Sequence, residues 1–150
     1  MIIMEDGIIK TAHSIQELAK KRGLDIEDLD RAGQFISSVM QKDVGQTLEF
    51  LYEITRFNRW DRQIKLIEKV ETLLYEKGIS DQVRPIPSKF AIPVFKAASY
   101  EYQEELHDIW ARLFSVALNP AMDFPRYAYI DIIKQIELID LRTLNACYED

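Results

Sequence analysis

The sequence is poor in the residues from which most metal sites and disulfide frameworks are built. It holds one cysteine, Cys147, and two histidines, His13 and His107. A single cysteine excludes an internal disulfide and a cysteine-rich zinc site, and it fits a reducing compartment. Neither histidine has a second histidine or a cysteine at a ligand spacing, which argues against zinc. We therefore expect no metal centre.

Phosphate-binding loops and nucleophile elbows are also missing. The glycines at positions 23, 33, 45 and 78 stand singly, so no glycine-rich loop could cradle a phosphate. The serines lack the G-x-S-x-G turn and the neighbouring His–Asp order that activate a serine nucleophile. We expect no catalytic residues and no cofactor, and the pattern favours a protein that is not an enzyme.

Long apolar runs are absent, and so is an excess of positive charge. No segment reaches the roughly 18 apolar residues that a membrane span needs, and the opening MIIMEDGIIK lacks the features of a signal peptide. We therefore expect no membrane partner. The net charge of −6 argues against a broad nucleic-acid footprint unless basic residues gather on one face. The length of 150 residues with 47% apolar residues is typical of one globular domain.

Between the sparse glycines and prolines, apolar residues recur at helical spacing. This predicts an all-α bundle of about six to seven helices. The clearest helix covers 101–118, where one stripe is formed by Leu106, Ile109, Trp110, Leu113, Phe114 and Ala117. A long helix is predicted over about 44–77, with a bend or break near 57–58. Shorter helices are predicted over 11–22, 26–39, 88–99, 126–135 and 139–147, and a strand is conceivable only within residues 1–9.

Prolines interrupt the chain after the long helix. Pro85 and Pro87 bar a helix there and favour extended backbone. We predict a hinge near 84–87 that joins an N-terminal half (1–83) to a C-terminal half (84–150) of a single helical domain.

One run, RFNRWDRQIKLIEK, merits a binding hypothesis. Its basic residues cover about a third of the helix circumference at 100° per residue; they are Arg56, Arg59, Arg62, Lys65 and Lys69. They lie largely opposite the apolar Trp60, Ile64 and Ile67, and could contact RNA, a nucleotide phosphate or an acidic partner. The simpler interpretation is a solvated face with local pairs such as Asp61–Lys65 and Lys65–Glu68. The acidic composition and the lack of interleaved exposed aromatics favour the simpler interpretation.

Glu104 and His107 have the Glu-x-x-His spacing that helical bundles use, in two copies, to bind a pair of metal ions. A second copy is absent, because no acid stands three residues before His13. His107 lies between the stripe positions of its helix, so we expect a solvated histidine. Trp60 and Trp110 lie on apolar stripes, and we expect both to pack in the core.

Three runs in the C-terminal part form a further pattern: RPIPSKFAIPVFKAAS, EELHDIWARLFSVALNP and YIDIIKQIELIDLRTL. This pattern, over Arg84 to Leu144, resembles the Abi-alpha family of bacterial proteins linked to abortive phage infection. Its signature positions, which we read as parts of the fold, are Pro85, Pro87, Pro93, Trp110, Leu113, Pro120 and Asp140. Asn119 departs from the aspartate usual in the family, and Glu137–Leu138 replaces a proline-containing turn.

The resemblance implies a bacterial, cytoplasmic protein that limits phage propagation, often through growth arrest or death of the infected cell. It implies no catalytic residues. We therefore predict a helical protein-interaction module that binds a phage or host protein and also forms a homo-oligomer. Two alternatives remain: a metal-dependent nuclease that grips its substrate with the basic helix 56–69, and a nucleic-acid or nucleotide sensor.

Overall fold

The structure, a computed structural model, describes residues 13–56 and 59–149. In these two ranges it contains helices and no strand, as predicted, and the predicted strand at 1–9 lies outside them. A first helix covers residues 13–22. The others are α2 (Ile26–Met40), α3 (Val44–Ile54), α4 (Trp60–Glu76), α5 (Ser88–Tyr100), α6 (Glu104–Leu118), α7 (Ala128–Gln135) and α8 (Leu138–Glu149). No helix of the described part is long and apolar enough to cross a membrane.

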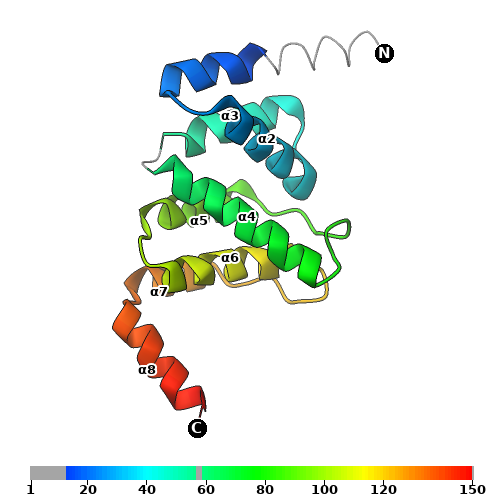
Figure 1. Cartoon of the computed structure of the whole chain (residues 1–150). Helices are drawn as coiled ribbons and strands as arrows, with labels where there is room; N and C mark the ends of the chain where they lie inside the picture. Colours follow the sequence, from blue (N-terminus) through cyan, green and yellow to red (C-terminus); the bar gives the residue numbers. More distant parts are fainter. Residues whose placement is uncertain (1–12, 57–58, 150) are drawn as a thin grey trace.

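The helices are stacked in layers along one direction (Figure 1), with the first helix at one end and α8 at the other. In the centre, α4 packs against both α5 and α6. Contacts between phenylalanine rings join the layers. The ring centroid of Phe35 in α2 lies 5.9 Å from that of Phe114 in α6, and the Phe114 centroid lies 5.5 Å from that of Phe95 in α5. Phe95 in turn lies 5.6 Å from Phe50 of α3. Residues from before and after position 84 therefore share one hydrophobic core.

The predicted long helix 44–77 is wrong in one respect, because it is two helices. α3 ends at Ile54 and α4 starts at Trp60, after Arg59 adopts a left-handed backbone with φ 67° and ψ 57°. A right-handed helix cannot continue through that conformation. The end of α3 is buried, and the carbonyl of Ile54 accepts a hydrogen bond from Nε2 of the buried Gln63 at 3.0 Å. The break, near the bend expected at 57–58, lets α3 pack on α2 while α4 reaches α6.

The proline-rich connector is extended, as predicted, and it is tied to the end of α6. The Arg84 amide donates to Leu118 O at 2.9 Å, and its guanidinium donates to Ala117 O at 2.6 Å and Val116 O at 3.1 Å. These bonds satisfy carbonyls that the last turn of a helix leaves without partners. Ile86 is buried in the core. The connector therefore fixes α6 relative to the start of α5.

The face of α6 that enters the core differs from the predicted stripe. Its buried residues are Leu106, His107, Trp110, Ala111, Phe114, Ala117 and Leu118. Ile109 and Leu113 are half-buried at the edge of this face. The stripe is rotated because α6 packs against α4 as well as α5. Trp110 is buried as predicted, and Trp60 is half-buried against the core.

Candidate functional site

In the structure, the basic residues of 56–69 fall into two groups, those that lie against α6 and those that remain exposed. The side chains of Arg62 and Lys69 are 12% and 17% exposed and lie against α6. Lys65 remains exposed, and Arg56 lies 3.8 Å from Glu53. The expected local pairs are replaced by others: Asp61 pairs with Arg59 at 3.2 Å, and Glu68 pairs with Arg31 at 3.1 Å. The expectation that these five cations lie largely opposite the core therefore does not describe Arg62 and Lys69.

Lys69 lies at the centre of a polar cluster between α4 and α6. Its ammonium Nζ lies 2.7 Å from Glu104 Oε2, 2.8 Å from Asp108 Oδ1 and 2.8 Å from His107 Nδ1. An ammonium has three N–H donors and no acceptor. All three are therefore used within the protein, by three residues spaced i, i+3 and i+4 on one face of α6.

Arg62 holds the same carboxylate from the other side. Its Nη1 donates to Glu104 Oε1 at 2.6 Å, and its Nε donates to the carbonyl of Glu101 at 3.0 Å. The hydrogen bonds from Lys69 and from Arg62 lower the pKa of Glu104 to about 2, because both favour the charged carboxylate. Glu104 therefore stays ionised and bridges the two cations of α4.

His107 was expected to be solvated, and that expectation is wrong. Its side chain is fully buried, because α4 covers this side of α6. Burial is the main cause that lowers the pKa of His107, and the nearby charges of Lys69 and Arg62 act in the same direction, whereas a hydrogen bond to the Arg62 backbone and the charge of Glu104 raise it. The pKa of His107 is lowered to about 4 as a result. Nε2 lies 3.0 Å from the carbonyl oxygen of Arg62. A neutral ring that accepts at Nδ1 from Lys69 and donates from Nε2 to this carbonyl fits both contacts.

The cluster's chemistry is that of a structural ion network. The Glu-x-x-His pair of Glu104 and His107 converges on the Lys69 ammonium, so a protein cation stands where such a pair would bind a metal. Among the described residues, no group of three or more His, Cys, Asp or Glu side chains is placed to hold a metal ion. A general base needs a free lone pair within reach of its substrate, and both nitrogens of His107 are engaged.

Beside this cluster lies an exposed patch of arginine and tyrosine that the sequence did not indicate. The guanidinium carbon of Arg59 lies 4.7 Å from the ring centroid of Tyr102, in cation–π geometry. Tyr102 is 66% exposed. Arg59 also donates from Nε and Nη2 to Asp61 at 3.2 Å, and this pairing raises the pKa of Arg59 and lowers that of Asp61. We call Arg59 and Tyr102 the Arg–Tyr patch.

The Arg–Tyr patch was missed because its members come from different elements. Arg59 belongs to the α3–α4 break, and Tyr102 lies just after the end of α5. The lack of interleaved exposed aromatics within 56–69 was taken as evidence against a binding surface. The aromatics are supplied by another part of the chain, which no local spacing indicates.

The predicted signature residues occupy structural positions. Pro87 is the N-cap of α5, and Pro93 lies inside that helix. Pro85 and Pro120 are exposed, and Leu113 is half-buried. The Asp140 carboxylate accepts a hydrogen bond from the amide of Glu137 at 3.0 Å, at the start of α8.

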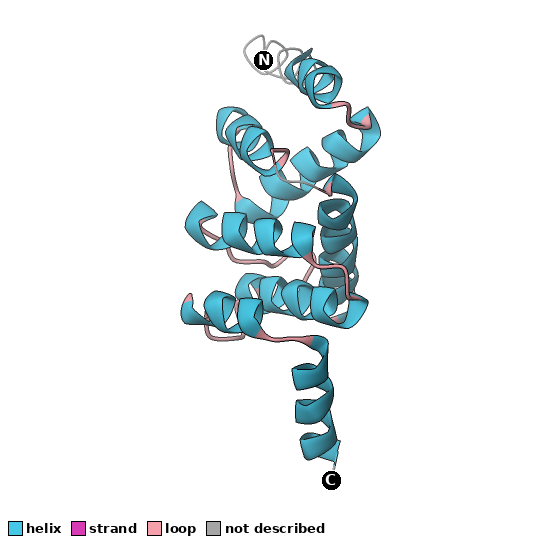
Figure 2. Ribbon diagram, turned by 90° about the vertical axis from the view of Figure 1, so that its left-hand side faces the viewer, coloured by secondary structure: helices cyan, strands magenta, loops and turns pink. Residues whose placement is uncertain are grey.

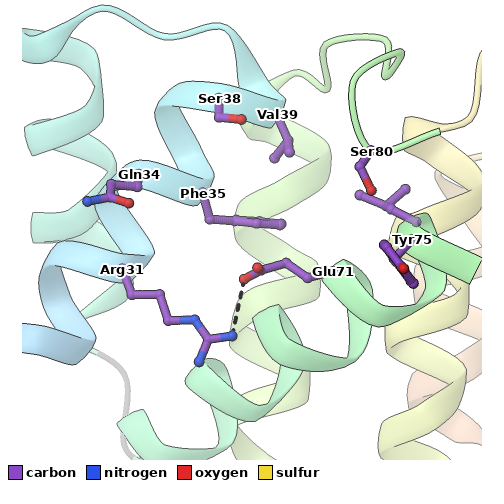
Figure 3. A pocket seen from close by; sticks show the side chains of 9 residues that line it. Arg31, Gln34, Phe35, Ser38, Val39, Glu71, Tyr75 and Ser80 are labelled. Atoms are coloured by element: carbon purple, nitrogen blue, oxygen red, sulfur yellow. Dashed lines mark ion pairs between the residues drawn. The ribbon is translucent and has the colours of Figure 1, made fainter. Parts of the chain in front are cut away.

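A hollow of about 440 Å³ lies between α2, α4 and the segment after α4 (Figure 3). Its apolar lining comes from Phe35, Val39 and Leu74. Arg31 lies on one side, where it pairs with Glu71 at 3.5 Å. None of the residues that we predicted to bind a partner lines this hollow.

Comparison with known proteins adds one finding. The family model described as abortive infection alpha matches residues 61–150, which is more than half of the chain. No curated protein and no solved structure matched the chain. The matched range contains Arg62 and Lys69 of α4 and their acidic partners on α6, Glu104 and Asp108. It confirms the resemblance read from the C-terminal runs, and the chain belongs to the abortive infection alpha family.

Proposed function

We propose that this protein is a helical interaction module that limits phage propagation by binding a host or phage protein. The family supplies the biological setting, abortive infection. The observation that supports protein binding is the Arg–Tyr patch, in which Arg59 stacks on Tyr102 while both side chains remain exposed.

Arginine and tyrosine are the residue types that most often dominate binding energy at protein interfaces. A contact residue binds more tightly when its side chain is already ordered, since less conformational entropy is lost. Asp61 and Tyr102 hold the Arg59 guanidinium on two sides. The cluster around Lys69 and Glu104 joins α4 to α6 directly beside it. The ion pairs between α4 and α6 therefore hold the Arg–Tyr patch in place.

The geometry weighs against the nucleic-acid and nuclease alternatives. To bind a phosphate, Lys69 would have to release Glu104, Asp108 or His107, and Arg62 would have to release Glu104. A metal-dependent nuclease needs carboxylates that are free to bind metal ions. Glu104 and Asp108 are both held by the Lys69 ammonium.

A phage plating assay tests the proposal. Bacteria that express the wild-type chain should reduce plating of at least one phage in a diverse panel. The double variant Arg59→Asn/Tyr102→Ser should lose this protection, because it removes both anchors while asparagine tolerates the left-handed backbone. Tyr75→Ser is the matched control, since Tyr75 is 79% exposed on α4 and lies outside the patch.

Circular dichroism should show the same helix content for all three proteins. Protection that survives in the double variant would overturn the role of the Arg–Tyr patch. An absence of protection by the wild-type chain against every phage tested would overturn the proposed function itself.

A further inference from the structure

A second pocket lies in the N-terminal part of the stack, among the first helix, α2 and α3 (Figures 1 and 2). Its volume of about 320 Å³ is within the size range of pockets that bind small organic molecules. The buried or half-buried lining residues, which form the floor, are Ile15, Gly33, Thr47, Leu48 and Leu51. The exposed lining residues, which form the rim, are Asp30, Gln34, Ser37 and Ser38. All of them precede the range 61–150 that matches the family model, and none belongs to the Arg–Tyr patch.

Gly33, in the middle of α2, leaves open space at the floor of this pocket. Its backbone is helical and its φ is not positive, so the conformation does not require a glycine. A Cβ at this position would lie 3.5 Å from Leu51 Cδ1, 3.9 Å from Ile15 Cδ1 and 4.0 Å from Thr47 Cγ2, which are ordinary contacts. Close packing therefore does not require a glycine either, and glycine inside a helix is less stable than alanine. What the glycine does here is keep the space in front of these three side chains unfilled.

Thr47 adds an unpaired polar group to the same floor. The residue is only 6% exposed, and its hydroxyl oxygen Oγ1 is buried and makes no hydrogen bond to any residue that the structure describes. The equally buried Thr55 of the neighbouring α3 end, by contrast, donates from Oγ1 to the carbonyl of Leu51 at 2.6 Å. Most buried hydroxyls have a partner, and one without a partner lowers stability. Threonine in a helix has two preferred χ1 rotamers, so the Thr47 hydroxyl can turn toward a group that enters the pocket.

The polar groups of the rim bond mainly to one another and to the backbone. Gln34 Nε2 donates to Asp30 Oδ2 at 3.0 Å, and Ser37 Oγ donates to the carbonyl of Lys42 at 3.3 Å. Among the described residues that line the pocket, Asp30 alone is charged, and it is exposed to water. A charged ligand would therefore lose its hydration at the floor without meeting a buried partner of opposite sign, which is unfavourable. The floor selects an uncharged ligand.

We propose that this pocket binds a small, uncharged organic molecule that has an apolar body and one hydrogen-bonding group. The body lies in the space in front of Gly33, against the apolar side chains of the floor. The hydrogen-bonding group pairs with the hydroxyl of Thr47, which lacks a partner among the described residues. The binding of such a molecule requires neither a phage nor a host protein, so this inference stands or falls separately from the proposed function.

An NMR titration of the full isotope-labelled chain with p-cresol tests the proposal. p-Cresol should shift the amide signals of Gly33 and Thr47 and leave that of Gly78, which does not line the pocket, unchanged. The matched probe p-xylene has a methyl group in place of the hydroxyl, and it should bind roughly fivefold more weakly because one hydrogen bond is lost. The charged analogues p-toluate and p-methylbenzylammonium should both bind more weakly than p-cresol.

Two substitutions that preserve the helices locate the ligand. Gly33→Ala fills the open space with a methyl group and should weaken p-cresol binding by about tenfold or more, while it raises the melting temperature because alanine favours the helix. Thr47→Val removes the unpaired hydroxyl and should reduce p-cresol binding to the level of p-xylene without lowering the melting temperature. Gly45→Ala is the matched control. It adds the same methyl group at an exposed position of α3 that does not line the pocket, and it should leave binding unchanged.

Each part of the proposal has an outcome that contradicts it. If the signals of Gly33 and Thr47 do not shift up to the solubility limit of p-cresol, or if Gly33→Ala binds p-cresol as tightly as the wild type, the pocket is not the binding site. If p-xylene binds as tightly as p-cresol, the Thr47 hydroxyl does not pair with the ligand. Tighter binding of either charged analogue would overturn the uncharged class of ligand.

Discussion

The Lys69 ammonium lies 2.8 Å from Nδ1 of the buried His107. A protonated ring could not accept this hydrogen bond, and its positive charge would face that of Lys69. The contact and the burial therefore both favour the neutral histidine, whose pKa falls to about 4. The stability of the α4–α6 contact is thereby linked to pH.

The first prediction is a loss of stability in acid that depends on His107. Between the ordinary histidine pKa of 6.5 and the folded value of about 4, the unfolded chain binds a proton that the folded chain does not. The free energy of unfolding should therefore fall as the pH falls through this window, by at most about 3 kcal/mol from this group. Glu104, with its pKa lowered from 4.5 to about 2, should add a further loss below the histidine window. Urea denaturation over a series of pH values measures both.

The variant His107→Gln separates the two groups. It cannot take up a proton, so its stability should vary less with pH between about 6.5 and about 4. It should keep the loss at lower pH that Glu104 causes. If the variant and the wild type lose stability equally across the upper window, the assignment to His107 is wrong.

The second prediction separates a structural lysine from a solvated one on the same helix. Lys69→Met removes the donor to Glu104, Asp108 and His107, and it should lower the free energy of unfolding by about 2 to 3 kcal/mol, because groups that are partly or fully buried lose their partner. Lys65→Met changes an exposed lysine and should stay within about 0.5 kcal/mol of the wild type. Equal effects of the two substitutions in urea denaturation would contradict the central role of Lys69.

The sequence indicated the helices better than the break between two of them. The apolar spacing of 44–77 is helical on both sides of residue 59, and neither glycine nor proline stands at the break. Arginine gives no sign that its backbone will be left-handed, since glycine and asparagine are the residues that normally adopt this conformation. The bend expected near 57–58 came from a drift in the helical register, which was the one available signal.

The sequence showed which residues of the polar cluster share a helix face, but their pairing could be predicted only from the packing of α4 on α6. Arg62 and Lys69 are seven residues apart and share a face of α4, and Glu104, His107 and Asp108 share a face of α6. Which face meets which depends on how α4 crosses α6. That crossing follows from the break at Arg59 and from the Arg84 connector, both of which are tertiary features. The burial of His107 was inaccessible for the same reason.

A third prediction concerns Arg84, the first residue of the family pattern. Its planar guanidinium donates to two carbonyls of α6 from Nε and Nη2 and lies 5.3 Å from the ring centroid of Phe124. A lysine ammonium cannot reproduce this fork or the stacking. Arg84→Lys should therefore lower the free energy of unfolding by about 1 to 2 kcal/mol, measured by urea denaturation. Arg126→Lys is the control, because Arg126 is exposed, and a comparable loss there would contradict the specific role of Arg84.

The fourth prediction uses two left-handed residues that follow helices. Gln41 follows α2 with φ 52°, and Gly78 lies after α4 with φ 69°. A side chain strains this backbone, whereas glycine adopts it freely. Gln41→Gly should therefore raise the free energy of unfolding by about 0.5 to 1 kcal/mol, although glycine is normally a destabilising substitution.

Gly78→Ala is the reverse change and should lower the free energy of unfolding by about 1 kcal/mol. A Cβ at residue 78 would have no neighbour within 4 Å, so this loss would come from backbone strain and not from a steric clash. Thermal and urea denaturation of both variants and the double variant measure the two effects. The sites lie at the ends of different helices, so the effects should add. If Gln41→Gly is destabilising, the end of α2 depends on the glutamine side chain more than on the backbone that it adopts.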